Sequence, residues 1–122
     1  MLPARVLVCD REHGELARMI TPVTGEVVAC NNLEEALRAS TRQPFDIAFV
    51  GVREHTETFV GLLQLLRRTL PRTPIILVLE DPSPAARLAT LTVRPFYVVV
   101  PPVSFDELDA VLADALAAAR RA

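Results

Sequence analysis

The sequence predicts an α/β domain built on a five-stranded parallel sheet. Five short apolar runs are each followed by a segment with helical spacing, so the 122 residues form five strand-then-helix units. The connections are short, and no linker or low-complexity segment interrupts the series. Alternating units of this kind form a parallel sheet with helices on both faces. Five units suit the doubly wound strand order 2-1-3-4-5, whose switch point lies between strands 1 and 3.

The predicted strands are continuous apolar runs, which is typical of strands buried on both faces of a parallel sheet. They are expected over residues 5–9, 26–30, 45–50, 75–79 and 96–100. The third run ends at Gly51. Ligands and chemistry in such folds lie beyond the carboxyl ends of the strands. A reactive side chain would therefore be expected at position 51, and glycine has no side chain to react.

Apolar residues recur at helical spacing after each strand. Helices are expected over about 12–21, 31–42, 57–70, 83–91 and from Ser104 to the C-terminal arginines. Two of these helices have a clear start. Asn31 and Asn32 are each followed three residues later by a glutamate, and Ser104 is followed by Glu107, which is the pattern of a capping box.

Composition and charge restrict the class of protein. Hydrophobic residues make up 51% of the chain and charged residues 23%, which indicates a globular domain. The formal net charge of −2 argues against a nucleic-acid or anionic-membrane surface. No run approaches the ~18 apolar residues of a membrane span, and the N-terminus lacks a signal pattern. We therefore expect a cytoplasmic protein whose Cys9 and Cys30 are reduced core thiols.

Acidic residues follow the first and fourth strands, whose ends the topology brings together. Because oxygen-rich loops hold Mg²⁺ or Ca²⁺, the weak metal candidates are Asp10, Glu12, Glu80 and Asp81. Arg11 would repel a metal; it could pair with these carboxylates in the cation's place, or lie solvated at the surface. His13 and His55 lack further ligands at metal spacing. No nucleophile with a base and no phosphate loop supports an enzyme, and no cofactor is implied.

Five segments together resemble the receiver domain of bacterial two-component response regulators, over essentially the whole chain. They are residues 5–12, 44–50, 62–67, 73–76 and 102–108. The second segment resembles the strand that leads to the phosphorylated aspartate, and the last resembles the lysine-proline turn and fifth helix. No single motif is specific, but their order and spacing are. The resemblance implies a flavodoxin-like (βα)5 fold and a role in signal transduction.

Carried over position by position, the resemblance implies a degenerate phosphorylation site. The phosphoacceptor aspartate falls on Gly51, and the second acidic residue, which binds magnesium, falls on Arg11, while the first is kept as Asp10. The signalling threonine or serine falls on Leu79, and the lysine falls on Pro101. Phosphorylation of a carboxylate needs a nucleophilic oxygen, a divalent cation and a further cation. This chain is therefore interpreted as a phosphorylation-independent pseudo-receiver.

Two further features follow from the resemblance. The family has a cis peptide bond before its proline, so a cis bond is predicted before Pro102. The switch aromatic of the fifth strand falls on Val98, with Tyr97 one position away.

The resemblance also implies an interaction surface, because receivers bind partners through the fourth helix, fifth strand and fifth helix. The candidate residues on that surface are Pro84, Arg87, Leu88, Tyr97 and Arg120.

The sequence is thus interpreted as a single domain, residues 1–122, that binds a partner protein or itself in signal transduction or transcription control. It is not expected to bind nucleic acid or membrane. The Ala-rich tail ending in Arg120 and Arg121 leaves open that the chain is the N-terminal domain of a longer regulator. The alternatives are a receiver that responds to a cation or small ligand at its acidic rim, a receiver phosphorylated at another position, and an enzyme on the same fold.

Overall fold

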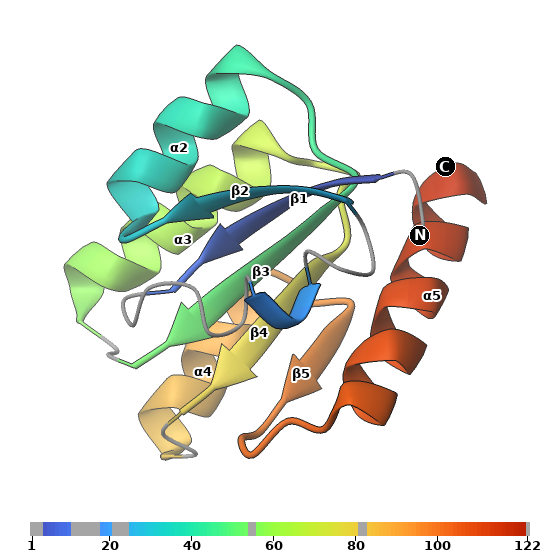
Figure 1. Ribbon diagram of the computed structural model, residues 1–122. Helices are drawn as coiled ribbons and strands as arrows, with labels where there is room; N and C mark the ends of the chain where they lie inside the picture. Colours follow the sequence, from blue (N-terminus) through green and yellow to red (C-terminus); the bar gives the residue numbers. More distant parts are fainter. Residues whose placement is uncertain (1–3, 11–17, 21–24, 54–55, 81–82, 122) are drawn as a thin grey trace.

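The computed structural model describes residues 4–10, 18–20, 25–53, 56–80 and 83–121. Its central element is one parallel sheet in the order β2-β1-β3-β4-β5 (Figure 1). The strands are β1 (Ala4–Cys9), β2 (Gly25–Cys30), β3 (Ile47–Val52), β4 (Ile75–Leu79) and β5 (Tyr97–Val99). All neighbouring strands pair in parallel. The predicted fold class and strand order are confirmed.

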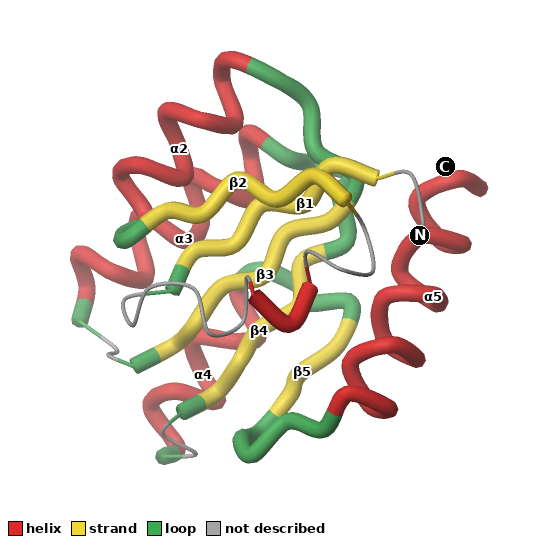
Figure 2. Tube along the Cα trace, viewed as in Figure 1, coloured by secondary structure: helices red, strands yellow, loops and turns green. Residues whose placement is uncertain are grey.

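The helices form two layers around the sheet (Figure 2). They are α2 (Leu33–Arg42), α3 (Glu57–Thr69), α4 (Pro84–Thr92) and α5 (Phe105–Arg121). Of the helix expected over 12–21, residues 18–20 are helical and the rest lies outside the described residues. Among the described helices, none combines the length and apolar character needed to cross a membrane.

The core consists of two clusters, one on each face of the sheet. Side chains alternate between the faces of a strand, so Val6 and Val8 of β1 pack toward α5, while Leu7 and Cys9 pack toward α2 and α3. β3 divides in the same way, with Phe49 fully buried on the α5 side. Burial on both faces explains why the strands are continuous apolar runs.

The starts of the helices follow the predicted caps. Asn32 Oδ1 accepts a hydrogen bond from the Glu35 backbone N–H at 2.9 Å, and the Glu35 carboxylate accepts one from the Asn31 N–H at 2.9 Å. These bonds close a capping box at the start of α2. Ser104 Oγ accepts the Glu107 N–H at 3.1 Å and so caps α5.

Two strand boundaries differ from the sequence prediction. β3 starts at Ile47 and passes through Gly51 to Val52, because Gly51 and Val52 pair with residues of β4. Gly51 therefore lies inside a strand and does not terminate it. β5 is shorter than expected and ends at Val99, just before Pro101, which has no N–H to donate to a neighbouring strand.

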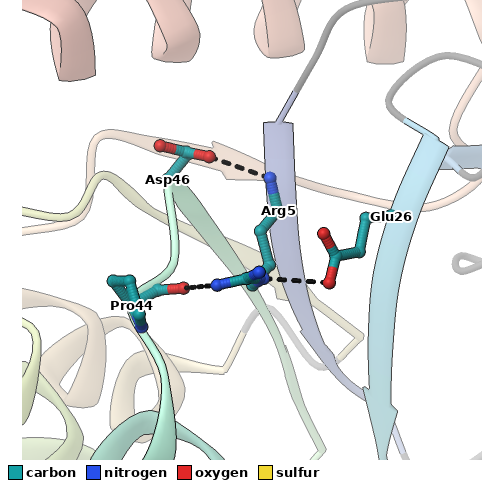
Figure 3. Close-up of polar contacts among 4 residues, drawn as sticks. All are labelled: Arg5, Glu26, Pro44 and Asp46. Carbon is teal, nitrogen blue, oxygen red and sulfur yellow. Dashed lines mark hydrogen bonds and ion pairs between the residues drawn. The ribbon is translucent and has the colours of Figure 1, made fainter.

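The amino ends of β1 and β3 are joined through Asp46 (Figure 3). Its carboxylate accepts a hydrogen bond from the Arg5 backbone N–H at 2.8 Å, and its own N–H donates to the Arg5 carbonyl at 2.9 Å. The Arg5 side chain donates to the Glu26 carboxylate at 2.9 Å and to the Pro44 carbonyl at 3.3 Å. Asp46 thus has a structural role at the end of the sheet opposite to the candidate site.

Candidate functional site

Three positions meet at the carboxyl edge of the sheet, where the topology predicts a site. Asp10 follows β1 directly, Gly51 lies near the end of β3, and Glu80 follows β4 directly. β1 and β4 are the two neighbours of β3 in the sheet. The backbone N–H of Glu80 donates to the Val52 carbonyl at 3.1 Å, which continues the pairing of β3 and β4 beyond the strand end.

A guanidinium group occupies the space between the two carboxylates. Nη2 of Arg53 lies 3.2 Å from Oδ1 of Asp10 and 3.2 Å from Oε1 of Glu80. The side chains of Arg53 and Asp10 are 21% and 13% exposed, so this pair is better shielded from water than an ordinary surface ion pair. Arg53 therefore connects the ends of β1 and β4 and offsets part of the negative charge of Asp10 and Glu80.

The backbone does not require a glycine at position 51. Gly51 does not have a left-handed φ, and a Cβ added there would lie 3.4 Å from Oδ1 of Asp10 and 3.6 Å from the Cys9 carbonyl oxygen, which are ordinary contacts. Gly51 is an interior strand residue that pairs with Val78. The reactive side chain is therefore missing at a place where the backbone would accept a Cβ.

The other positions that the resemblance singled out bring no polar group to the rim. Leu79 is 3% exposed and belongs to the core cluster that α2 and α3 cover. Pro101 follows β5 at the same edge, and the peptide bond between Pro101 and Pro102 is cis, as predicted. Val98 is 36% exposed and Tyr97 45%.

Several sequence candidates lie outside the described residues. They are Arg11, Glu12, His13, His55 and Asp81. The pairing suggested for Arg11 therefore stays a prediction. Among the residues that the structure does describe, no three histidine, cysteine, aspartate or glutamate side chains gather as a metal site. Of the proposed metal ligands, Asp10 and Glu80 are described, and both contact Arg53.

A cavity of about 350 Å³ opens beside Gly51, between the starts of α2 and α3. Arg53, Asn32 and Phe59 contribute to its polar and apolar walls, and Cys9 lines it from β1. Volumes of this size are typical of small-ligand sites. The cavity lies at the switch point between β1 and β3, where ligands bind in folds of this topology.

Both cysteines are buried and free, as expected. Cys9 and Cys30 are register partners on β1 and β2. Burial, together with smaller contributions from the neighbouring Cys30, Asp10 and Glu35, raises the pKa of the Cys9 thiol from 9.0 to about 12. Burial, with a contribution from Glu35, also raises the pKa of Cys30. Neither thiol is therefore a ready nucleophile at neutral pH.

A second surface of functional interest lies around β5, which is an edge strand flanked by α4 and α5 on opposite faces of the sheet (Figure 1). The predicted interaction residues Pro84, Arg87, Leu88, Tyr97 and Arg120 are all exposed. The structure adds large apolar side chains that the sequence analysis did not select, namely Leu91, Val100 and Phe105, exposed by 71%, 52% and 62%. Together with Leu88 and Tyr97 they form what we call the β5 surface.

Arg53 is the site residue that sequence reasoning missed. The segment after Gly51 was expected to reach the site, but Arg53 was not singled out within it. The available signal was charge, because Arg53 is the one arginine in the loop from Gly51 to His55 and follows a strand whose two neighbours end in carboxylates. Arg11 was considered as the cation because Asp10, Glu80 and Asp81 were expected to converge beside it.

Solved structures with the same fold include receiver domains of signalling proteins. A response regulator receiver domain protein from Methanospirillum hungatei is 18% identical, with a TM-score of 0.83 over 99% of this chain and 98% of that one. The signal receiver domain of an HD domain-containing protein from Pseudomonas fluorescens is 18% identical, with a TM-score of 0.86 over all of both chains. Vibrio cholerae chemotaxis protein CheY4 is 21% identical, with a TM-score of 0.79 over 93% and 99%.

These similarities establish the fold of the chain. It has the CheY-like receiver-domain fold found in the response regulators of signal transduction. No protein-family model matches the sequence, and no curated protein matches it. The assignment therefore rests on the three-dimensional structure together with the motifs in the sequence.

Proposed function

We propose that this chain is a phosphorylation-independent receiver module, which acts in the cytoplasm by binding another protein or a second copy of itself in signal transduction or transcription control. The observation that carries the proposal is the Arg53 guanidinium, which lies 3.2 Å from both Asp10 and Glu80 beside a glycine. On this proposal the Arg53 guanidinium takes the place of the magnesium ion that the resemblance implies. Gly51 has no side-chain oxygen to phosphorylate.

The chemistry of phosphoryl transfer supports this proposal. Phosphorylation of a carboxylate requires a nucleophilic oxygen and positive charge to neutralise the phosphoryl oxygens. Asp10 keeps a carboxylate, but its Oδ1 is engaged by Arg53. Leu79 and Pro101 offer neither a hydroxyl nor an ammonium group. On this account the module catalyses no reaction and needs no cofactor.

The β5 surface is the interface that the proposal assigns to the partner. Leu88 and Leu91 of α4 are exposed by 66% and 71%, which is unusual for leucines on a helix already packed against a sheet. Burying such side chains in a contact contributes about 25 cal/mol per Å² of apolar area. Clustered exposed apolar residues typically mark interaction sites.

Two measurements test the proposed function. Incubation with acetyl phosphate and Mg²⁺, followed by intact-protein mass spectrometry, is expected to show no added phosphoryl mass. Light scattering after size-exclusion chromatography is expected to show a dimer that Leu91→Asp dissociates. Leu65→Asp on α3, where Leu65 is 46% exposed, is the matched control and should leave the dimer intact. If the parent is a monomer, the β5 surface serves a different partner.

A second candidate function is favoured by the cavity beside Gly51. A small ligand at this position would contact Arg53 and the starts of α2 and α3. Binding there could shift the conformation only through a difference in affinity between two states.

The remaining alternative is a receiver that is phosphorylated at a non-standard residue. A phosphoryl group detected by mass spectrometry and mapped to a residue other than position 51 would support it.

A further inference from the structure

Two open depressions lie at the amino end of the sheet, opposite to the candidate site. One, of about 460 Å³, extends from the end of α2 to the loop between α3 and β4. The other, of about 420 Å³, extends from the same loop to the start of β5 and to α5. They share Pro71, Arg72 and Thr73. We call the combined surface the amino-end groove.

The amino-end groove is strongly basic. Its lining contains four arginines and no carboxylate: Arg42, Arg67, Arg72 and Arg94. Arg42, Arg72 and Arg94 are exposed. Arg42, Arg72 and Arg94 do not take part in the ion pairs that Arg5 and Arg53 form with Glu26, Asp10 and Glu80. The groove therefore carries positive charge that the described residues leave uncompensated.

One pair of arginines in the groove repel each other. Arg67 donates hydrogen bonds to the carbonyls of Val93, Leu70, Thr73 and Arg94. Burial lowers the pKa of Arg67, and the nearby charge of Arg94 lowers it further. An anion bound beside them would relieve this repulsion.

The position of Arg94 adds a second observation. Its φ of 47° lies in the left-handed region, where glycine is favoured because it has no Cβ. The chain has arginine there nevertheless. A helix dipole explains basic residues in the last turn of a helix, such as Arg42 of α2. Arg94 directly follows Val93, the C-cap of α4, and Arg72 lies two residues beyond Leu70, the C-cap of α3, so the carboxyl ends of three helices bring exposed arginines to this groove.

We propose that the amino-end groove binds an acidic segment of a partner protein, whose carboxylates pair with Arg42, Arg72 and Arg94. The planar guanidinium group matches the two oxygens of a carboxylate. Phe96, 39% exposed, and the prolines of the lining provide apolar contacts for the stem of such a segment. Ala118 of α5 also lines the groove, and Arg121 lies one turn further along that helix, which extends the basic surface.

The charge distribution favours an acidic protein segment over nucleic acid. The chain has a net charge of −2; Asp10 and Glu80 lie at the opposite edge of the sheet, while Asp46 and Glu26 at the amino end are bound to Arg5. A long polyanion is repelled by that overall charge, whereas a short acidic segment contacts the groove alone. This inference concerns a different face from the proposed function and does not depend on it.

The test is a titration of the ¹⁵N-labelled protein with a short fluorescein-labelled peptide of glutamate and serine. We expect saturable amide shifts confined to Arg42, Arg72, Thr73, Arg94 and Phe96, and affinity that falls as salt rises. Arg72→Gln and Arg94→Gly should each weaken binding about two- to fivefold, the size of an exposed charge pair. Arg94→Gly also relieves the left-handed backbone, so it is expected to fold.

Arg38→Gln is the matched control, because Arg38 is an exposed arginine one turn before Arg42 that does not line the groove. The Arg38→Gln variant should bind the peptide with the same affinity as the parent protein. The proposal is overturned if the peptide does not bind saturably at low salt, if the shifts fall elsewhere, or if Arg72→Gln and Arg94→Gly bind like the parent. Tighter binding of a single-stranded oligonucleotide of equal charge at the same residues would overturn the choice of partner.

Discussion

Nη2 of Arg53 lies 3.2 Å from Oδ1 of Asp10, and the two side chains come from the ends of neighbouring strands. The same nitrogen lies 3.2 Å from the Glu80 carboxylate. One arginine therefore bridges two carboxylates that would otherwise repel each other across β3. Its guanidinium lies between the two carboxylates and offsets one of their two negative charges.

Replacement of Arg53 by glutamine should destabilise the domain and create a weak metal site. The shielded Asp10 carboxylate and the exposed Glu80 carboxylate would then face each other without a cation, and we expect the free energy of unfolding to fall by roughly 1 kcal/mol. Mg²⁺ should restore part of this loss. Urea denaturation with and without MgCl₂ measures both effects, and Arg53→Lys, which keeps the charge, should lose less. Equal stability of Arg53→Gln and the parent would contradict this account.

Gly51→Ala should stabilise the protein. The added Cβ meets only ordinary contacts, and alanine in a strand loses less conformational entropy on folding than glycine, so a gain of about 0.5 kcal/mol is expected. Gly25 is the matched control because its φ is 83°; Gly25→Ala should lose about 1 kcal/mol. Thermal unfolding of the two variants and the parent measures whether each substitution raises or lowers stability. Destabilisation by Gly51→Ala would show that the backbone does need this glycine.

Arg67→Met should be among the most destabilising single substitutions outside the apolar core. The Arg67 guanidinium donates hydrogen bonds of 2.7–3.2 Å to four backbone carbonyls. These bonds connect the end of α3 to the loop before β5. Leaving these acceptors without a donor should cost about 2–4 kcal/mol. The adjacent Arg68 is exposed, so Arg68→Met should change stability by about 0.5 kcal/mol at most. Equal urea midpoints for the two variants would refute the assigned role.

Asp46→Ala should weaken the junction between β1 and β3. It removes the acceptor of the Arg5 N–H at 2.8 Å, at an expected cost of about 1 kcal/mol. Asp46→Asn keeps an acceptor oxygen and should lose less. Urea unfolding compares the stability of the variants, and hydrogen exchange of the Arg5 amide reports on the hydrogen bond itself. If the Arg5 amide exchanges at the same rate in Asp46→Ala as in the parent, the hydrogen bond to Asp46 is contradicted.

The buried thiols make stability depend on pH in the alkaline range. The folded pKa of Cys9 is raised from 9.0 to about 12, so above pH 9.0 the unfolded chain releases a proton that the folded chain retains. The stability contributed by the neutral thiol is complete below pH 9.0 and is lost as pH rises toward 12, by about 1.4 kcal/mol per pH unit. Cys9→Ala should show a shallower alkaline loss in urea unfolding; a slope equal to that of the parent would contradict this assignment.

Much of the fold could be predicted from the sequence because its signals are local. Apolar runs, the Asn32 and Ser104 caps and the order of the elements were sufficient for the sheet, and the family pattern gave the cis bond before Pro102. The extent of β3 was wrong because a glycine usually signals a strand end. Pairing with β4 carries the strand through Gly51 to Val52.

The contacts of the site were less predictable because they depend on side-chain reach across strands. Arg53 lies 43 residues from Asp10 and 27 from Glu80 in the sequence, and no periodic pattern connects them. Arg67 and Asp46 likewise act on backbone groups far along the chain. Sequence patterns indicate which face of an element is buried, but they do not specify which polar groups meet.

The most direct test of the central claim is an amide NMR titration with Mg²⁺ and then with beryllofluoride, a phosphoryl mimic. We predict that the signals of Asp10, Gly51 and Arg53 do not move, because Arg53 already engages both carboxylates and no acceptor is present at position 51. Saturable shifts at these residues would contradict the account and would identify the acidic rim as a working ligand site.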